Sequence, residues 1–102
     1  MWKTIVIDDE QLARQRIKRL LKEYDEVDIV AEAENGQEGL TIIEQQKPDL
    51  IFLDIEMPIL NGFEMLAKLK HQPKVVFTTA YDQYAIKAFE EGSIDYLIKP
   101  IE

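Results

Sequence analysis

The sequence contains no cysteine, which excludes disulfide bonds, zinc sites built on thiolates and cysteine nucleophiles. Its one histidine, His71, receives no functional role, so zinc or copper is not expected. No apolar run approaches the roughly 20 residues that a membrane helix needs. No signal peptide precedes the first acidic residues either. We therefore expect a cytoplasmic domain that makes no membrane contact.

Basic residues are the minority: 12 Lys and Arg stand against 20 Asp and Glu, which gives a net charge of −8. An acidic surface repels phosphate backbones, so this domain is not expected to bind nucleic acid itself. A basic run is nevertheless present and comprises Arg14, Arg16, Lys18, Arg19 and Lys22. We interpret this run as the solvated face of a helix rather than as a polyanion site. With 102 residues, the chain is long enough for one core and too short for two.

Five short apolar segments predict the strands of a sheet. They are TIVI (4–7), VDIVAEA (27–33), DLIFL (49–53), KVVFTT (74–79) and DYLI (95–98). Their content of Ile, Val, Phe and Leu is typical of strands buried on both faces. Their starts lie about 20–25 residues apart, which is the length of one strand plus one crossover helix.

Segments with helical periodicity lie between these strands. They predict helices over residues 10–24, 36–46 and 82–91, and one more after Asn61 and Gly62. The buried stripe of the first helix is predicted to run from Ala13 to Tyr24. Pro48 would stop the second helix. Asp82 would N-cap the fourth helix and Gly92 would end it.

This alternation predicts an α/β fold: a doubly wound, flavodoxin-like parallel sheet of five strands in the order 2-1-3-4-5. A fifth helix is missing, because the last strand is followed by Lys99, Pro100 and only two further residues. We expect the chain to be a piece of a longer protein, or to borrow a helix from a neighbour. One face of the last strand would then be uncovered. We expect a dimer or domain swap through the region of the fourth helix and the fifth strand.

Polar residues gather where the predicted strands end. They are Asp8, Asp9 and Glu10 after the first strand, Asp54 after the third, Thr78 and Thr79 in the fourth and Lys99 after the fifth. Taken singly, each has an ordinary explanation: an N-cap, a β-forming residue or an exposed lysine. Functional sites of open parallel sheets, however, form at this edge. Three crowded carboxylates repel one another, and one lysine does not neutralise them. A hard divalent cation, Mg²⁺ or another such as Mn²⁺, would.

A carboxylate beside a divalent cation, an ammonium and a hydroxyl can accept a phosphoryl group. The cation and the lysine neutralise charge on the transferred group, and the carboxylate is the nucleophile. The residues therefore predict metal-dependent phosphorylation of an aspartate. Their spacing alone leaves both Asp54 and Asp9 open as the acceptor.

Four segments, IVIDDE, LIFLDIEMPILNG, VVFTTAYD and DYLIKP, resemble in order and spacing the receiver domain of two-component response regulators. The resemblance covers the whole chain, residues 1–102. It implies that Asp54 is the phospho-acceptor. It also implies that Asp8 and Asp9 are the acidic pair that holds Mg²⁺ together with Asp54 and the backbone carbonyl of Glu56.

The same resemblance assigns the remaining site residues. Thr79 matches the switch hydroxyl, Lys99 the invariant lysine, and Tyr96 the aromatic residue that moves inward on activation. Lys99 and Pro100 match a cis peptide bond of the family. The resemblance further implies that the phosphoryl donor is a sensor histidine kinase. Self-phosphorylation and autodephosphorylation of Asp54 would be the only reactions, so the domain is not expected to be an enzyme for a free substrate.

The run TTAYDQYAIKAFE (78–90) resembles receivers of the LytR/AlgR group. Members of that group carry a LytTR DNA-binding domain further along the chain. The resemblance thus implies a C-terminal output domain in a longer parent protein, and a role in transcription regulation.

Three other functions share part of this pattern. A flavin mononucleotide binder needs a phosphate loop rich in Ser, Thr and Gly after the first strand, where this chain has DDEQ. A haloacid-dehalogenase-like phosphatase would place a general-acid Asp two residues after its nucleophile, where Glu56 stands. A receiver-like protein-interaction module without phosphorylation is the alternative. The complete set of site residues argues against it.

Overall fold

The computed structural model describes residues 1–100 and contains one five-stranded sheet in the order β2-β1-β3-β4-β5. All four strand pairs are parallel. The strands are β1 (Trp2–Ile7), β2 (Val27–Ala33), β3 (Leu50–Asp54), β4 (Lys74–Thr79) and β5 (Asp95–Ile98). The helices are α1 (Gln11–Leu21), α2 (Gly36–Gln46), α3 (Gly62–Ala67) and α4 (Ala85–Glu90), with a 3₁₀ turn, η1 (Asp82–Tyr84), before α4. The predicted fold class and strand order are confirmed.

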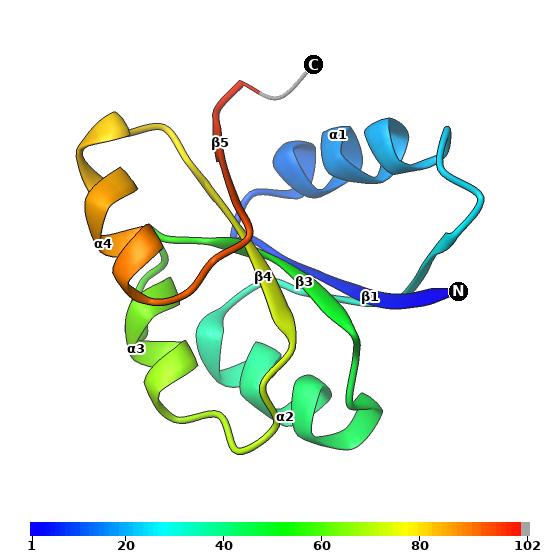
Figure 1. Cartoon of the computed structure of the whole chain (residues 1–102), viewed down its shortest axis with the longest axis horizontal. Helices are drawn as coiled ribbons and strands as arrows, with labels where there is room; N and C mark the ends of the chain where they lie inside the picture. The colour runs from blue at the N-terminus through cyan, green and yellow to red at the C-terminus, as the bar shows by residue number, and fades with distance from the viewer. Residues whose placement is uncertain (101–102) are drawn as a thin grey trace.

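Helices cover both faces of the sheet, as Figure 1 shows. One core lies between the sheet and α2, α3 and α4, and includes Ile7, Leu53 and Phe77. A smaller core lies beneath α1 and includes Ile17 and Phe52. Neighbouring residues of a strand therefore serve different cores, because successive side chains point to opposite faces.

The central strands are buried, whereas the edge strands are not. Every residue of β3 is buried, and so are the last four residues of β1. In β2, however, exposed residues alternate with half-buried ones over residues 27–31 and only Ala33 is buried, and β5 has no fully buried residue. The prediction of a strand buried on both faces is therefore wrong for β2, whereas the exposure of β5 agrees with the expectation that one of its faces is uncovered. Each lies at an edge, where it has one neighbouring strand and incomplete helix cover.

Two predicted helix boundaries are also wrong. α1 ends at Leu21, and Tyr24 is 48% exposed in the turn that leads into β2. The backbone N–H of Val27 donates to the Tyr24 carbonyl, so this segment already belongs to the connection. α4 begins at Ala85, because Asp82 starts the 3₁₀ turn and makes no side-chain cap. Gly92 has a φ of +81° and ends α4 as predicted.

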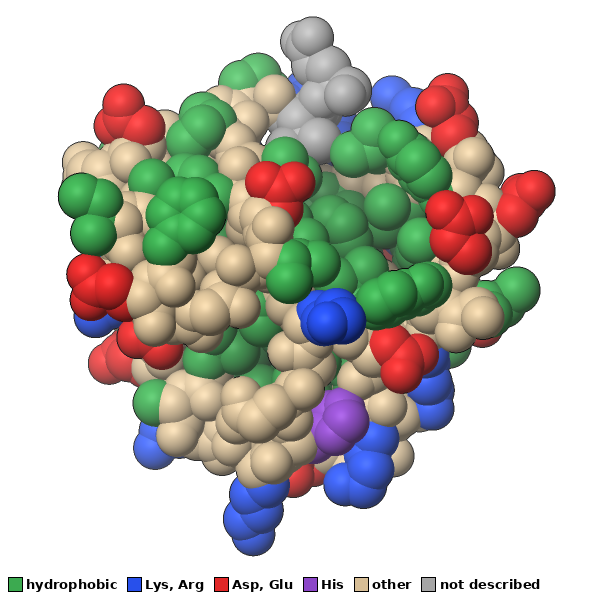
Figure 2. Space-filling view, viewed as in Figure 1, with side chains coloured by type: hydrophobic (Ala, Val, Ile, Leu, Met, Phe, Trp, Pro, Cys, Tyr) green, Lys and Arg blue, Asp and Glu red, His purple; other side chains and the backbone are tan. Residues whose placement is uncertain are grey.

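The basic run on α1 is only partly a solvated face. Arg14 and Lys18 both form ion pairs with Glu32 of β2, at 3.1 and 2.7 Å. The Arg14 side chain is only 14% exposed, so it ties α1 to the edge of the sheet. On the face shown in Figure 2, acidic and basic side chains are mixed around the periphery and apolar side chains gather near the middle. Within residues 1–100, every helix is too short or too polar to cross a membrane.

Candidate functional site

Two aspartates stand side by side at the carboxyl edge of the sheet. In the parallel ladder of β1 and β3, Ile7 pairs with Leu53. Asp8 and Asp54 each follow one of these paired residues, so the fold places them next to each other. Asp8 is 0% exposed and Asp54 is 1% exposed. The site therefore holds two buried carboxyl groups.

Lys99 joins these acids from the end of β5. Its backbone N–H donates to the Thr79 carbonyl at 2.7 Å, which fixes the residue against β4. Its Nζ lies 2.9 Å from Asp8 Oδ2, 2.9 Å from Glu10 Oε1 and 3.5 Å from Asp54 Oδ2. The side chain is only 14% exposed, so the ordinary expectation of an exposed lysine does not hold. The Lys99–Pro100 peptide bond is cis, the isomer that the resemblance implies.

The electrostatics of this group favour an additional cation. Burial, followed by the charge of Asp8, raises the pKa of Asp54 to about 8, and Lys99 only partly opposes this. Burial also raises the pKa of Asp8. Burial alone would lower the pKa of Lys99, but the contacts with Asp8, Glu10 and Asp54 outweigh it and raise that pKa. One ammonium thus serves three carboxyl groups, and a further positive charge would stabilise their ionised forms.

The donor set fits a hard divalent ion. Carboxylate oxygens of Asp8, Asp9 and Glu10 lie within 4.8 Å of one another. The buried Oδ2 of Asp8 lies 2.9 Å from Lys99 Nζ and accepts no hydrogen bond from any other of residues 1–100. The proximity of Asp9 adds to the raised pKa of Asp54. An oxygen-only set, in which two buried carboxyl groups share one ammonium, suits Mg²⁺ or Mn²⁺.

Glu10 is the residue of this site to which the sequence assigned no role. The expected ligands were Asp8, Asp9, Asp54 and the backbone carbonyl of Glu56. Glu10 Oε1 and Asp8 Oδ2 both lie 2.9 Å from Lys99 Nζ. The signal in the sequence is the third consecutive acid of the DDE run. Three successive residues after a strand turn in different directions, however, so the run alone does not say which of them reaches the lysine.

The two threonines at the end of β4 point to opposite faces of the sheet. Thr79 is buried, and its Oγ1 accepts a hydrogen bond from the backbone N–H of Tyr81 at 3.2 Å. Thr78 pairs with Asp54 in the ladder of β3 and β4. The buried Thr78 Oγ1 has no hydrogen-bond partner among the described residues. The Thr79 hydroxyl thus holds the loop that leads to η1.

Tyrosines link this loop to its surroundings. The half-buried Tyr96 donates its hydroxyl proton to the backbone carbonyl of Tyr81. The hydroxyl of Tyr84 donates to the carboxylate of Glu56. The link between Tyr84 and Glu56 joins η1 to the segment after β3 and was not predicted. The two residues are 28 positions apart in the chain, and no local pattern relates them.

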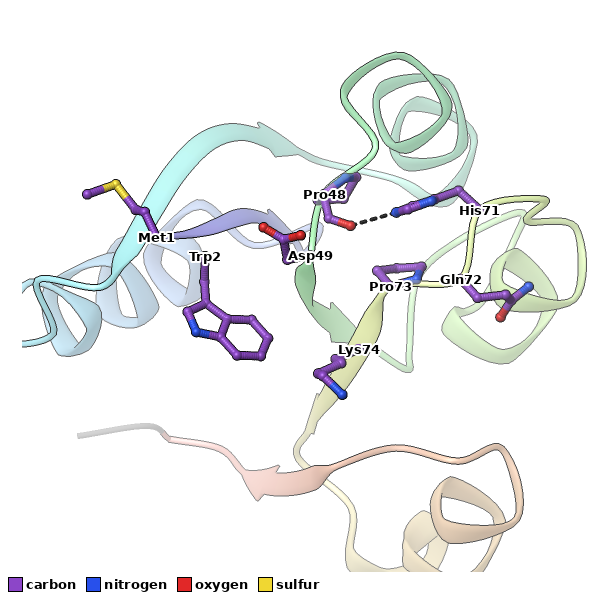
Figure 3. A pocket seen from close by; sticks show the side chains of 8 residues that line it. All are labelled: Met1, Trp2, Pro48, Asp49, His71, Gln72, Pro73 and Lys74. Carbon is purple, nitrogen blue, oxygen red and sulfur yellow. Dashed lines mark hydrogen bonds between the residues drawn. The ribbon is translucent and has the colours of Figure 1, made fainter.

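A separate pocket lies at the opposite, amino end of the strands (Figure 3). It measures about 480 Å³ and is lined by Met1, Trp2, Pro48, Asp49, His71, Gln72, Pro73 and Lys74. Here His71 Nε2 lies 2.6 Å from the Pro48 carbonyl oxygen. The backbone N–H of His71 donates to Glu44 at the same time. His71 therefore links the segment before β4 to the segment before β3, at the end of the sheet opposite to Asp8 and Asp54.

The chain resembles known proteins over its whole length. The Transcriptional regulatory protein BtsR of Escherichia coli (strain K12) is 47% identical over 104 residues, which are 100% of this chain and 44% of that relative. An Uncharacterized response regulatory protein of Vibrio cholerae shows the same identity and the same shares. The chain thus spans less than half the length of the curated relatives that it matches.

Solved structures with the same fold include two response regulator domains. One is the response regulatory domain of mrkE from Klebsiella pneumoniae, with a TM-score of 0.87 and 35% identity over 98% of this chain and 84% of that one. Another is the response regulator domain of CheB from Thermotoga maritima, with a TM-score of 0.85 and 28% identity over 98% of this chain and 79% of that one. The family model described as Response regulator receiver domain matches residues 4–102. Because this match spans nearly the whole sequence, the chain belongs to the response regulator receiver domain family and serves phosphorelay signalling.

Proposed function

We propose that Asp54 accepts a phosphoryl group from a sensor histidine kinase in a reaction that needs Mg²⁺ or a similar divalent ion. The observation that carries this proposal is the position of Lys99, whose ammonium contacts Asp8, Glu10 and Asp54 at once. Asp8 and Asp54 are both buried, both have a raised pKa and both contact Lys99. The resemblance to the receiver family supports Asp54, rather than Asp8, as the acceptor. Such a carboxyl group suits a nucleophile that must be kept from reacting until charge compensation arrives.

The transfer is a substitution at phosphorus. A carboxylate oxygen of Asp54 forms the new O–P bond while the P–N bond of the donor phosphohistidine breaks, and the electron pair leaves with the imidazole nitrogen. Lys99 stabilises the negative charge on the transferred oxygens. Asp8, Asp9, Asp54 and the backbone carbonyl of Glu56 would hold the metal. When bound, the metal supplies positive charge that lowers the pKa of Asp54 and offsets the charge of the phosphoryl group.

Phosphorylation would then shift the protein between two states. The phosphoryl group adds roughly two negative charges beside Lys99. We infer that the Thr79 hydroxyl leaves the Tyr81 N–H to donate to a phosphoryl oxygen. Tyr96, which holds the Tyr81 carbonyl, would repack as the loop moves. A conformational change of this kind biases a pre-existing equilibrium rather than creating a new state.

The output would be read from the surface of α4 and β5. This surface exposes apolar side chains that include Ile86, Phe89 and Ile98. We propose that a second copy or a C-terminal output domain binds there, in a longer protein of the LytR/AlgR type with a LytTR DNA-binding domain. The relative's name, Transcriptional regulatory protein BtsR, supports a role of the longer protein in transcription regulation. The receiver itself would turn over no free substrate and would catalyse only its own phosphorylation and dephosphorylation.

Intact-protein mass spectrometry tests this function. The protein is incubated with acetyl phosphate, with Mg²⁺ or with excess EDTA. We expect one phosphoryl group, present only with Mg²⁺ and lost in Asp54→Asn. Asp25→Asn makes the same chemical change in an exposed loop and should be labelled like the wild type. If Asp54→Asn were labelled as fully as the wild type, another residue would be the acceptor. A wild type without label would favour the interaction module that is not phosphorylated.

A further inference from the structure

The ammonium group of Lys99 donates a hydrogen bond to the carboxylate of Glu10. The ammonium Nζ and the Glu10 Oε1 lie 2.9 Å apart. The contact with Asp8 is an ion pair of the same length, and Asp54 is the farthest of the three acids at 3.5 Å. In this state the lysine is therefore bound more closely to Glu10 than to Asp54.

Glu10 differs from the other two acids in its exposure. Its side chain is 64% exposed, whereas the side chains of Asp8 and Asp54 are 0% and 2% exposed. Glu10 is the N-cap residue of α1, but its side chain makes no capping hydrogen bond. The backbone of Glu10 is anchored independently, since its N–H donates to Asp8 Oδ1 at 2.9 Å. The carboxylate is thus free to exchange Lys99 for water without loss of helix or strand contacts.

We propose that Glu10 is a positioning residue that holds the Lys99 ammonium while Asp54 is unmodified and gives it up when a phosphoryl group arrives. The inference rests on the proposed function, because it needs an anionic group on Asp54. That group presents oxygens that form charge-assisted hydrogen bonds with an ammonium. Glu10 competes for the same ammonium, so it weakens the hold of the site on the phosphoryl group and favours the inactive state.

Beryllofluoride, which mimics a phosphoryl group on a carboxylate, measures this competition without any transfer reaction. Each variant is brought to saturating Mg²⁺ and titrated with beryllofluoride, and the dissociation constant is read from the amide NMR signals around Asp54. Because exposed ion pairs are weak, Glu10→Ala should tighten binding by about two- to fivefold. Glu10→Gln, which keeps an acceptor oxygen without the charge, should fall between Glu10→Ala and the wild type. Glu23→Ala, at an exposed position beyond the end of α1, should match the wild type.

A double-mutant cycle separates competition for Lys99 from the mere removal of a negative charge. In a Lys99→Ala background there is no ammonium for Glu10 to hold. Glu10→Ala should then change the dissociation constant by no more than about 1.5-fold. If Lys99→Ala does not fold, Lys99→Gln replaces it, because the amide still donates hydrogen bonds to the buried acids.

The outcomes distinguish the two proposals. A wild type that binds no beryllofluoride at Asp54 in Mg²⁺ overturns the proposed function and this inference with it. A wild type that binds, combined with unchanged binding in Glu10→Ala, overturns this inference alone. So does equal tightening in both backgrounds, which would assign the effect to charge. Weaker binding with a higher Mg²⁺ requirement would make Glu10 a metal ligand and would also overturn it.

Discussion

In the absence of metal, replacement of Asp54 by Asn should stabilise the protein at alkaline pH. Asp54 is 1% exposed and lies beside Asp8, and its pKa rises from 3.8 to about 8. In the unfolded chain the group ionises near pH 4, so between these values the folded state binds the extra proton. Unfolding free energy must therefore fall as the pH rises from about 4 to about 8.

The structure sets the size of this effect. A shift of this span corresponds to at most about 6 kcal/mol, at 1.36 kcal/mol for each pKa unit. Relaxation and water penetration weaken charge interactions in folded proteins, so we expect roughly 2–4 kcal/mol. Asn is nearly isosteric with Asp and carries no charge at any pH. Asp54→Asn should thus exceed the wild type in stability at pH 8 and approach it near pH 4.

Urea denaturation in EDTA at pH 5 and pH 8 measures this difference. Asp25→Asn, in an exposed loop, serves as the control for the loss of one negative charge. Saturating Mg²⁺ at pH 8 should raise the stability of the wild type much more than that of Asp54→Asn, because the ion binds the folded state. Wild-type stability that rises between pH 5 and pH 8 in EDTA, or equal stability of the two proteins at pH 8, would refute the reasoning.

Three further substitutions follow from the same contacts. Lys99→Ala leaves Asp8 and Asp54 without their cation, so in EDTA at pH 9, where Asp54 is ionised in the wild type, it should cost about 3–5 kcal/mol in urea denaturation. The loss should shrink at pH 5, where Asp54 is protonated, and an equal loss at both pH values would contradict this. Gly62→Ala places a Cβ 2.6 Å from the Asp54 carbonyl oxygen, so it should cost about 1–3 kcal/mol and shift the amide NMR signals around Asp54, whereas unchanged signals would show that the backbone accommodates the methyl group. Asn61→Ala removes the capping box that Asn61 forms with Glu64, so it should lower stability by about 1 kcal/mol, and a variant as stable as the wild type would mean that water replaces the cap.

Much of the fold could be predicted because its signals are local. The segment 50–54 is apolar throughout and becomes the fully buried central strand β3. Gly92 marked the end of α4 because glycine adopts a positive φ at no steric cost. The failures were tertiary. Tyr24 continued the apolar period of α1, but the chain turns toward β2 before that residue is reached. Asp82 had the chemistry of an N-cap but entered a 3₁₀ turn instead.

The candidate site shows the same division. Asp8 and Asp54 could be placed together, because neighbouring parallel strands bring their carboxyl ends to one edge. The closest contacts of Lys99 could not be predicted, since they depend on how the residues after β1 turn and on where β5 ends. Glu10 therefore gained its role only from the structure. The side-chain contact of Glu56 with Tyr84 is likewise visible only in the structure, because it joins two loops that the sequence does not relate.

A crystal structure with Mg²⁺ and beryllofluoride tests the central claim most directly. We expect the ion to lie about 2.0–2.1 Å from carboxylate oxygens of the acidic pair, Asp8 and Asp9, and of Asp54. The backbone carbonyl of Glu56 should complete the protein ligands. The beryllofluoride should be bonded to Asp54, with Lys99 turned toward its fluorines and away from Glu10. An adduct on another residue, or an ion that does not touch Asp54, would contradict the account.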